Sequence, residues 1–259
     1  MNIEYAVPSY NRATGVLTLD YLSKAKMYVS PQDYPNYIKH NAKHADRIIE
    51  VPDGVQGKGK AHAMNYLLDV LWKPGVDAVI FIDDDVSKLM AHVKNGRDIE
   101  KSEEDFYEIA ENNCRLAKEW GCGMWSFNLN SDPMTYDEFK PFRLHAYLDG
   151  GCQGIVQDDG LRYDEVLTVK EDVDMFLQQI QMYHKALRVE KYYLKKRSFE
   201  GAGGSQAFRS KKSEQEQFRI MQEKWGSDII RPNKPTATND GGIRSLGGAI
   251  RIHLPLKGA

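Results

Sequence analysis

Hydrophobic residues in the first half of the chain form two alternating kinds of pattern. Short apolar runs predict buried strands over residues 3–8, 47–51 and 77–82. Apolar residues at helical spacing predict helices over residues 14–28, 61–71 and 102–119. Because strands alternate with helices, the pattern predicts an α/β fold with a mostly parallel sheet flanked by helices.

The second half of the chain has a less regular pattern. It predicts strands over residues 124–130, 150–157 and 188–194, and helices over residues 173–183 and 213–225. Residues 197–212 are rich in glycine, serine, arginine and lysine, which is typical of a mobile loop. Neither an internal repeat nor a linker-like stretch divides the 259 residues, so we expect a single domain.

Composition places the chain among ordinary globular proteins. It is 41% hydrophobic and 28% charged, and no apolar run approaches the roughly 20 residues of a membrane span. The first residues show no signal-peptide pattern, and three cysteines without metal-ligand spacing fit a reducing compartment, so we expect a cytoplasmic protein. The formal net charge of −2 argues against coating nucleic acid by bulk charge, although a local basic face stays possible.

The strongest chemical signal is the acidic triplet Asp83, Asp84 and Asp85, which follows the most apolar predicted strand. Adjacent carboxylates raise one another's pKa unless a cation compensates their charge, and oxygen ligands of this kind suit Mg²⁺ or Mn²⁺. In extended backbone, Asp83 and Asp85 share one side and Asp84 lies on the other. The alternative is an acidic loop that caps a helix.

Three further segments carry polar groups at the predicted ends of strands or starts of helices. Residues 8–12, PSYNR, offer hydroxyl, amide and guanidinium groups to a nucleotide, or form an ordinary polar turn. Residues 57–65, GKGKAHAMN, lack Walker A spacing but suit an anion at a helix start, or form a flexible basic turn. Glu171 and Asp172 precede a helix, where they provide a general base or cap the helix electrostatically.

These four segments, AVPSYNR, GKGKAHAMN, FIDDD and the later Glu-Asp pair, occur in an order that resembles GT-A fold glycosyltransferases. More narrowly, the chain resembles the phage glycosyltransferases associated with TET/JBP-type thymine hydroxylases, which are related to the base J glucosyltransferase. The resemblance implies metal-dependent, inverting transfer of a sugar from a UDP-sugar to a hydroxyl. The implied acceptor is a 5-hydroxymethylpyrimidine such as 5-hydroxymethylcytosine in bacteriophage DNA, modified in the host cytoplasm. Residues 1–123 would form the nucleotide-sugar half and residues 124–259 the acceptor half.

The same resemblance implies roles for individual residues. Contacts to the nucleotide-sugar would come from Pro8, Ser9, Tyr10, Arg12, Lys58, His62, Asn65, Asp83, Asp84 and Gly151. The Mn²⁺ or Mg²⁺ ligands would be Asp83, Asp85 and the late histidine His253, which has a structural role as its alternative. Asp172, with Glu171 beside it, would act as the catalytic base. The glycines of residues 150–154 would let sugar and acceptor approach the backbone, or form a tight turn.

A DNA acceptor would have to be single-stranded or leave the base stack, and basic residues near aromatic ones should then border the pocket. The candidates are Lys195, Lys196, Arg197, Arg209 and Lys211. The alternative is a solvated charged face over buried aromatic side chains.

Three other functions remain compatible with the sequence. The chain could glycosylate a protein or polysaccharide, act as a nucleotidyltransferase, or bind nucleotide or DNA without catalysis. A UDP-sugar assay separates the first from the second, since a nucleotidyltransferase releases pyrophosphate from a nucleoside triphosphate.

Overall fold

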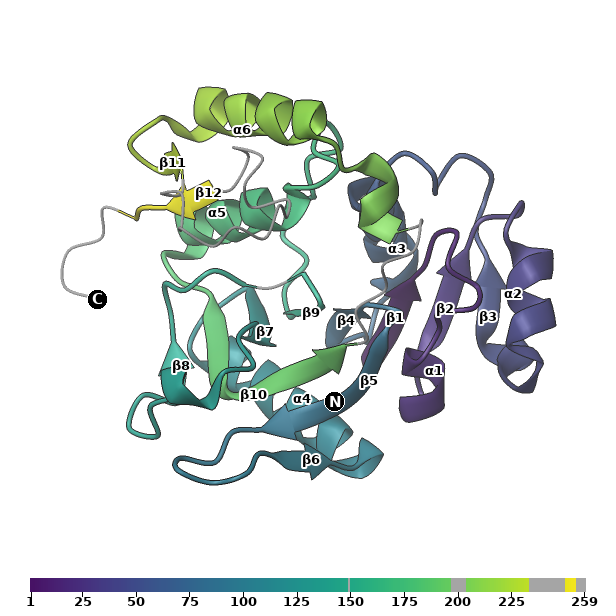
Figure 1. Ribbon diagram of the computed structural model, residues 1–259, viewed down its shortest axis with the longest axis horizontal. Helices are drawn as coiled ribbons and strands as arrows, with labels where there is room; N and C mark the ends of the chain where they lie inside the picture. The colour runs from purple at the N-terminus through teal and green to yellow at the C-terminus, as the bar shows by residue number, and fades with distance from the viewer. Residues whose placement is uncertain (149, 197–203, 233–249, 255–259) are drawn as a thin grey trace.

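The computed structural model describes residues 1–148, 150–196, 204–232 and 250–254 (Figure 1). The elements up to the middle of the chain are β1 Ile3–Pro8, α1 Thr18–Tyr21, β2 Lys26–Val29, α2 Tyr34–His40, the 3-10 helix η1 Ala42–Arg47, β3 Ile48–Glu50, α3 Lys60–Leu71, β4 Ala78–Ile82, β5 Val86–Ala91, β6 Ile99–Lys101 and α4 Glu103–Glu119. The remaining elements are β7 Met124–Asn128, η2 Pro133–Thr135, β8 Phe142–Arg143, β9 Cys152–Ile155, α5 Glu171–Tyr183, β10 Leu187–Lys196, η3 Gly204–Phe208, α6 Lys211–Trp225, β11 Ile230–Pro232 and β12 Ile250–Ile252.

One ten-stranded sheet runs through the described part of the chain, in the order β3-β2-β1-β4-β9-β7-β10-β5-β6, with β8 paired to β10. The pairings β3-β2, β2-β1, β1-β4 and β7-β10 are parallel, and the others are antiparallel. Among the described strands of this sheet, only β5, β8 and β9 therefore run antiparallel to the direction that the other strands share. The predicted α/β fold, with a mostly parallel sheet flanked by helices, is confirmed.

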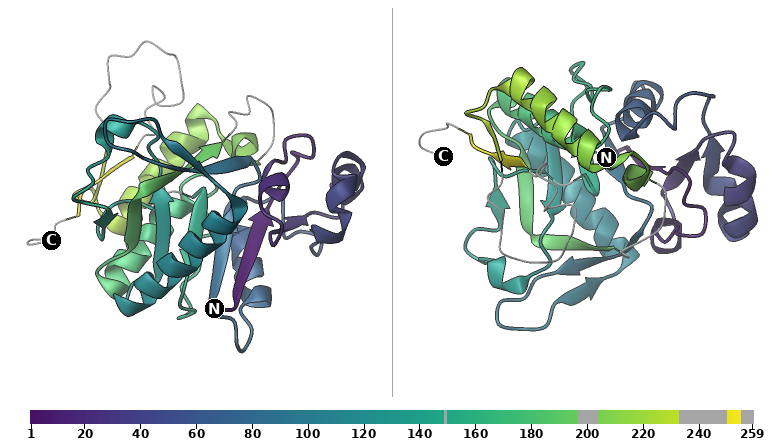
Figure 2. Two further views of the ribbon diagram at one scale, coloured as in Figure 1. Left: turned by 90° about the horizontal axis from the view of Figure 1, so that it is seen from below. Right: turned by 45° about the horizontal axis from the view of Figure 1, so that its top comes forward.

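Alternate residues of the central strands pack on opposite faces of this sheet. In β4, Ile80 and Ile82 belong to one core, which contains residues of α1, α2 and α4. Val79 and Phe81 belong to the other core, under α3, α5 and α6. The two views in Figure 2 show α4 on the face opposite α5 and α6. The arrangement explains why β4 reads as an unbroken apolar run: both of its faces are covered by helices.

The sheet combines strands from both halves of the sequence. β7, β9 and β10 come from the second half and are inserted between β4 and β5 of the first. The division into a nucleotide-sugar half and an acceptor half stays a prediction. None of the helices among the residues described is long and apolar enough to cross a membrane.

Most predicted elements lie where the pattern placed them, but the helix expected over residues 14–28 is wrong. Only residues 18–21 are helical, and residues 26–29 form β2 beside β1. Strand pairing decides this segment, because the Met27 and Val29 side chains enter a core that the sheet creates. The amides of Leu17 and Thr18 also bond to the Asp84 carbonyl, which fixes the chain before the short helix.

The hairpin of β5 and β6, directly after the acidic triplet, was not predicted. Its first strand has only two half-buried positions, Ser87 and Lys88, among buried ones, and it pairs antiparallel with β10, with Val86 opposite Lys196. Of the stretch predicted as a loop, residues 197–203 lie outside the described residues. Residues 204–208 form η3, and α6 already begins at Lys211.

Gly154 in β9 is required by the packing of a neighbouring strand. A Cβ at this position would lie 2.1 Å from Nε1 of Trp125, whose indole is fully buried and donates to the Cys114 sulfur. We predict that Gly154→Ala lowers the free energy of unfolding by ~1–3 kcal/mol, the usual cost of overpacking a core. Urea denaturation would measure it.

The Trp125→Leu background provides the control, because it removes the indole that the new methyl group would meet. The same Gly154→Ala change should cost clearly less there. An equal cost in both backgrounds would show that the indole is not the reason for the glycine.

Candidate functional site

The acidic triplet lies at the carboxyl end of β4, with its charge compensated by cations from distant segments. Asp83 Oδ1 is 2.6 Å from Lys60 Nζ at the start of α3, and Oδ2 is 3.0 Å from Lys196 Nζ at the end of β10. Burial alone would raise the pKa of Asp83, but Lys196 and Lys60 outweigh it and hold the pKa well below its ordinary value. Asp83 is therefore ionised throughout the physiological range.

Asp84 points into the fold. Its carboxylate accepts hydrogen bonds from Ser9 Oγ and, at 3.0 Å, from Arg12 Nη1, and the residue is only 4% exposed. Burial raises its pKa to about 6, although the Ser9 hydrogen bond and Arg12 oppose the rise. Asp84 thus joins the loop after β1 to the end of β4.

Asp85 carries the least satisfied carboxylate of the three. Its Oδ2 is 3.7 Å from Arg12 Nη1, whereas Oδ1 is buried without a hydrogen-bond partner among the described residues. Burial and the charge of Asp83 raise its pKa. A buried carboxylate oxygen of this kind fits a divalent cation.

The triplet does not form a complete metal cage by itself. Within the described ranges, no group of three or more His, Cys, Asp or Glu side chains could hold a metal ion. Mg²⁺ usually takes one or two protein carboxylates and completes its shell with water and substrate phosphates. Asp83 and Asp85 would supply that part of the shell.

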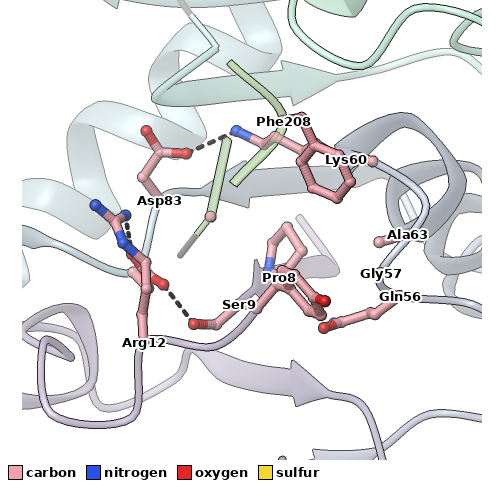
Figure 3. Close-up of a pocket in the computed structure, with 13 residues that line it drawn as sticks. Pro8, Ser9, Arg12, Gln56, Gly57, Lys60, Ala63, Asp83 and Phe208 are labelled. Atoms are coloured by element: carbon pink, nitrogen blue, oxygen red, sulfur yellow. Dashed lines mark hydrogen bonds and ion pairs between the residues drawn. The ribbon is translucent and has the colours of Figure 1, made fainter. Parts of the chain in front are cut away.

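A pocket opens between the triplet, the loop after β1 and the start of α3 (Figure 3). Its lining residues are Pro8, Ser9, Tyr10, Arg12, Gln56, Gly57, Gly59, Lys60, Ala63, Asp83, Asp84, Gly204 and Phe208. At one end lie Asp83 and Lys60; elsewhere the rings of Tyr10 and Phe208 stack with centroids 6.1 Å apart. A pocket with cations on one side and stacked rings on another has the chemistry of a nucleotide site.

The sequence placed several of these residues in the site, and the structure brings them together: Pro8, Ser9, Tyr10, Arg12, Asp83 and Asp84 all line the pocket. Three expected nucleotide contacts lie elsewhere. Lys58 is exposed, His62 is 2.9 Å from Glu165, and the buried Asn65 holds the backbone of Tyr163.

Beside the triplet, the glycine run connects this pocket to the predicted base. The Gly151 carbonyl accepts from the Asp83 amide at 3.0 Å, and the Gly150 carbonyl accepts from Lys60 Nζ at 2.8 Å. A Cβ on Gly150 would lie only 3.2 Å from Asp172 Oδ2. The glycine therefore allows the backbone that binds Lys60 to lie close against the Asp172 carboxylate.

Asp172 and Glu171 occupy different environments at the start of α5. Asp172 is half-buried, accepts hydrogen bonds from Tyr147 Oη and its neighbour's amide, and lines a second pocket. Glu171 is 5% exposed, and its Oε2 has no hydrogen-bond partner in the described part of the chain. Burial and the charge of Asp172 raise the pKa of Glu171. Of the two carboxylates, Asp172 is the one that a second substrate can reach.

The second pocket combines an apolar wall with basic groups. It is lined by His145, Tyr147, Val169, Lys170, Asp172, Val173, Phe176, Arg209, Ile250, Ile252 and Leu254. Lys170 is already paired at 2.5 Å with Glu214 of α6, and Arg209 is 3.7 Å from the same carboxylate. Arg209 is one of the predicted nucleic-acid contacts.

The remaining predicted residues are spread over the molecule. Lys195 lies 3.4 Å from Glu100 on the outer hairpin, Lys196 binds Asp83 inside the site, and Lys211 is exposed as the first residue of α6. Arg197 lies outside the described residues. His253 is exposed beyond β12, where its amide donates to the Ile229 carbonyl.

Comparison with known proteins gives weak likenesses only. No model of a known protein family matches the sequence, and no curated protein matches it significantly. S. aureus TarS 1–349 with UDP superposes with a TM-score of 0.46 and 12% identity, over 74% of this chain and 60% of that chain. Glucosyl-3-phosphoglycerate synthase from Mycobacterium tuberculosis with Mn²⁺, UDP and phosphoglyceric acid gives 0.48 and 14%, over 90% and 82%. 4-Diphosphocytidyl-2C-methyl-D-erythritol synthase from Anaerococcus prevotii DSM 20548 gives 0.43 and 14%, over 77% and 91%.

The chain thus spans 60% of the TarS chain that it resembles. Likenesses at this level do not decide which reaction the protein performs.

Among the pocket residues that were not singled out from the sequence are four with polar or aromatic side chains that the site uses: Gln56, Lys60, Tyr147 and Phe208. A signal existed for Lys60, which lies in the GKGKAHAMN run at the predicted start of a helix. Gln56, Tyr147 and Phe208 carry no local pattern, since only folding brings them near the triplet or Asp172.

The buried Glu171 makes folding stability depend on pH. Because its folded pKa lies above its unfolded value of 4.5, the unfolded state ionises first, and Glu171 destabilises the fold as pH rises past 4.5. Each unit of difference corresponds to ~1.4 kcal/mol. We predict that Glu171→Gln gains stability relative to the wild-type protein between pH 5 and pH 8.

Urea denaturation of both proteins at the two pH values measures this effect. Glu223→Gln, at an exposed position on α6, should give a difference from wild type that does not change with pH. A pH-independent difference for Glu171→Gln would contradict the predicted burial of its charge.

Proposed function

We propose that the chain transfers a sugar from a UDP-sugar to a hydroxyl acceptor, with a divalent metal and with inversion at the anomeric carbon. The position of Gly150 supports this proposal more than any other observation, because this glycine contacts both Lys60 and the predicted base Asp172. Its carbonyl accepts a hydrogen bond from Lys60, which lines the first pocket, and its Cα faces Asp172, which lines the second pocket. A sugar lying over this glycine would have a leaving group on one side and a base on the other.

Charge on the departing diphosphate would be neutralised by side chains already gathered at the end of β4. Lys60 lines the pocket and binds Asp83, and Lys196 binds the other oxygen of the same carboxylate, so both cations lie at the end of the pocket where phosphate oxygens would be placed. Bound Mn²⁺ or Mg²⁺, held by Asp83 and Asp85, would act as a Lewis acid toward the diphosphate.

Asp172 would remove the proton from the incoming hydroxyl. Tyr147 Oη donates a hydrogen bond that orients its carboxylate, and the second pocket, which Asp172 lines, would give the acceptor access from the side of this base. A single displacement from that side inverts the anomeric carbon. Nuclear magnetic resonance of the product would reject this mechanism if the anomeric configuration were retained.

The contrast between Asp172 and Asp85 tests this division of roles. We predict that Asp172→Asn lowers kcat by about 10²–10⁴-fold, the range typical of a lost general base, while Mn²⁺-dependent UDP binding persists. Asp85→Ala should lose both turnover and the metal dependence of UDP binding, because the buried oxygen that fits the cation is gone. Steady-state kinetics and calorimetric titration with UDP and Mn²⁺ separate the two outcomes.

Asp228→Asn, at an exposed position after α6, serves as the matched control and should keep both properties. Release of pyrophosphate from a nucleoside triphosphate, without use of UDP-sugars, would replace the proposal by a nucleotidyltransferase. Metal-dependent UDP binding without turnover on any acceptor would leave a non-catalytic module.

For the acceptor, we propose 5-hydroxymethylpyrimidine in DNA. The second pocket supports this proposal with an apolar wall of Ile250, Ile252 and Leu254, which suits a flat base, and with Arg209, which suits a phosphate. Among the other predicted basic contacts that the structure describes, Lys211 lies on the same segment, and Lys195 and Lys196 are engaged elsewhere.

We predict that Arg209→Gln raises the KM for a hydroxymethylated oligonucleotide and lowers the salt dependence of its binding by about one unit of slope, as for one phosphate contact. Arg219→Gln, on an exposed part of α6 and paired with Glu223, should behave as wild type. Incubation with Mn²⁺ and several UDP-sugars, followed by mass spectrometry of the nucleosides, measures transfer. Glycosylation of protein or polysaccharide but not of DNA would overturn the acceptor.

A further inference from the structure

We call the pocket that Asp83, Lys60, Tyr10 and Phe208 line the nucleotide-type pocket. It contains a buried amide oxygen without a hydrogen-bond partner in the described part of the chain. Gln56 is 9% exposed and lines the pocket, and its Oε1 has no hydrogen-bond partner among the residues described. Its Nε2 donates to the Tyr28 carbonyl at 2.6 Å. The amide group cannot be reversed without setting two oxygens against each other, so an acceptor, and not a donor, is presented to the pocket.

Two aromatic rings lie in the same pocket as this acceptor. Tyr10 comes from the loop after β1 and Phe208 from η3, and their rings are inclined by only 30°. Two stacking contacts of ~3.5 Å each need ring planes about 7 Å apart, and the two centroids are 6.1 Å apart, so the rings would separate on binding to admit a planar ring. Figure 3 shows Phe208 lying across the pocket from Gln56 and Ser9.

Backbone contacts join the two segments that carry these rings. The Gly204 amide donates to the Tyr10 carbonyl at 2.9 Å, which ties η3 to the first loop. Gly57 lies against the Tyr10 ring, where an added Cβ would come within 3.5 Å of the phenol. The slot is therefore bordered by segments that hold each other in place.

We propose that Tyr10 and Phe208 enclose the nucleobase of the donor, and that Gln56 Oε1 accepts a hydrogen bond from a ring N–H of that base. This inference rests on the proposed function, which supplies the nucleoside diphosphate. Uracil has a single ring N–H, at N3, between two carbonyl groups, and it matches a lone acceptor. The base would lie in the slot, and the diphosphate would extend toward Lys60 at the other end of the pocket.

A nucleotide that differs by one methyl group tests the assignment on the unmodified protein. N3-methyl-UDP keeps the stacking surface, ribose and diphosphate but has no ring N–H. We predict that wild-type protein with Mn²⁺ binds UDP about 10–100-fold more tightly than N3-methyl-UDP, because the buried acceptor stays unsatisfied with the analogue. Calorimetric titration measures both affinities. Equal affinities would overturn the inference.

Two variants separate recognition of the N–H from stacking. Gln56→Met should weaken UDP but not N3-methyl-UDP, which reduces the preference to threefold or less. Phe208→Leu should weaken both ligands by a similar factor of about five or more and leave the preference intact. The Tyr28 carbonyl still accepts from the Ser9 amide at 3.1 Å in Gln56→Met, and thermal unfolding would check that this variant folds.

The outcomes distinguish this inference from the proposed function. If a folded Gln56→Met protein still preferred UDP over N3-methyl-UDP to the same extent, Gln56 would be rejected as the residue that recognises the ring N–H. The proposed UDP-sugar reaction would be unaffected by this result. Failure of the wild-type protein to bind any nucleoside diphosphate would reject the donor itself, and the slot with it.

Discussion

The burial of three adjacent carboxylates at the end of β4 is the constraint around which the rest of the site is organised. Their charge is tolerated because Arg12, Lys60 and Lys196 approach from the first loop, from α3 and from the end of β10. Buried charges without partners would cost several kcal/mol each. Ion pairing thus draws three segments that are distant in sequence onto one strand end, and the pocket lies where they meet.

The three carboxylates are not equivalent, although they are neighbours in sequence. Asp84 is committed to the fold through Ser9 and Arg12, and Asp83 is shared between two lysines. Asp85 retains a buried oxygen without a partner in the part of the chain described. One acid thus holds the loop that borders the nucleotide-type pocket, and the other two are the ligands that we propose for a cation.

A second buried ion pair links the two pockets. Lys170, which precedes α5, is 2.5 Å from Glu214 of α6, and Gln217 of α6 accepts from the Val169 amide. The same segment continues backward to η3, where Phe208 lies beside Tyr10. The wall of the nucleotide-type pocket and the turn that carries Asp172 are therefore attached to one helix. A ligand that moves Phe208 acts on a segment that also supports the start of α5.

The sequence by itself determined the α/β fold and the position of the acidic triplet, because β4 is apolar on both faces and is followed directly by Asp83, Asp84 and Asp85. Strand and helix periodicity is local, so the strands β1, β3, β4, β7, β9 and β10 and the helices α3, α4, α5 and α6 could be predicted. The helix expected over residues 14–28 failed because pairing with β1, a non-local interaction, made residues 26–29 a strand. Tertiary structure alone decided which cations meet the triplet: Lys196, expected on a DNA-binding surface, reaches Asp83 because β10 pairs with β5. It also brought Gln56 and Phe208, more than 150 residues apart, to one pocket, since no local pattern encodes a contact between segments that only the folded sheet places side by side.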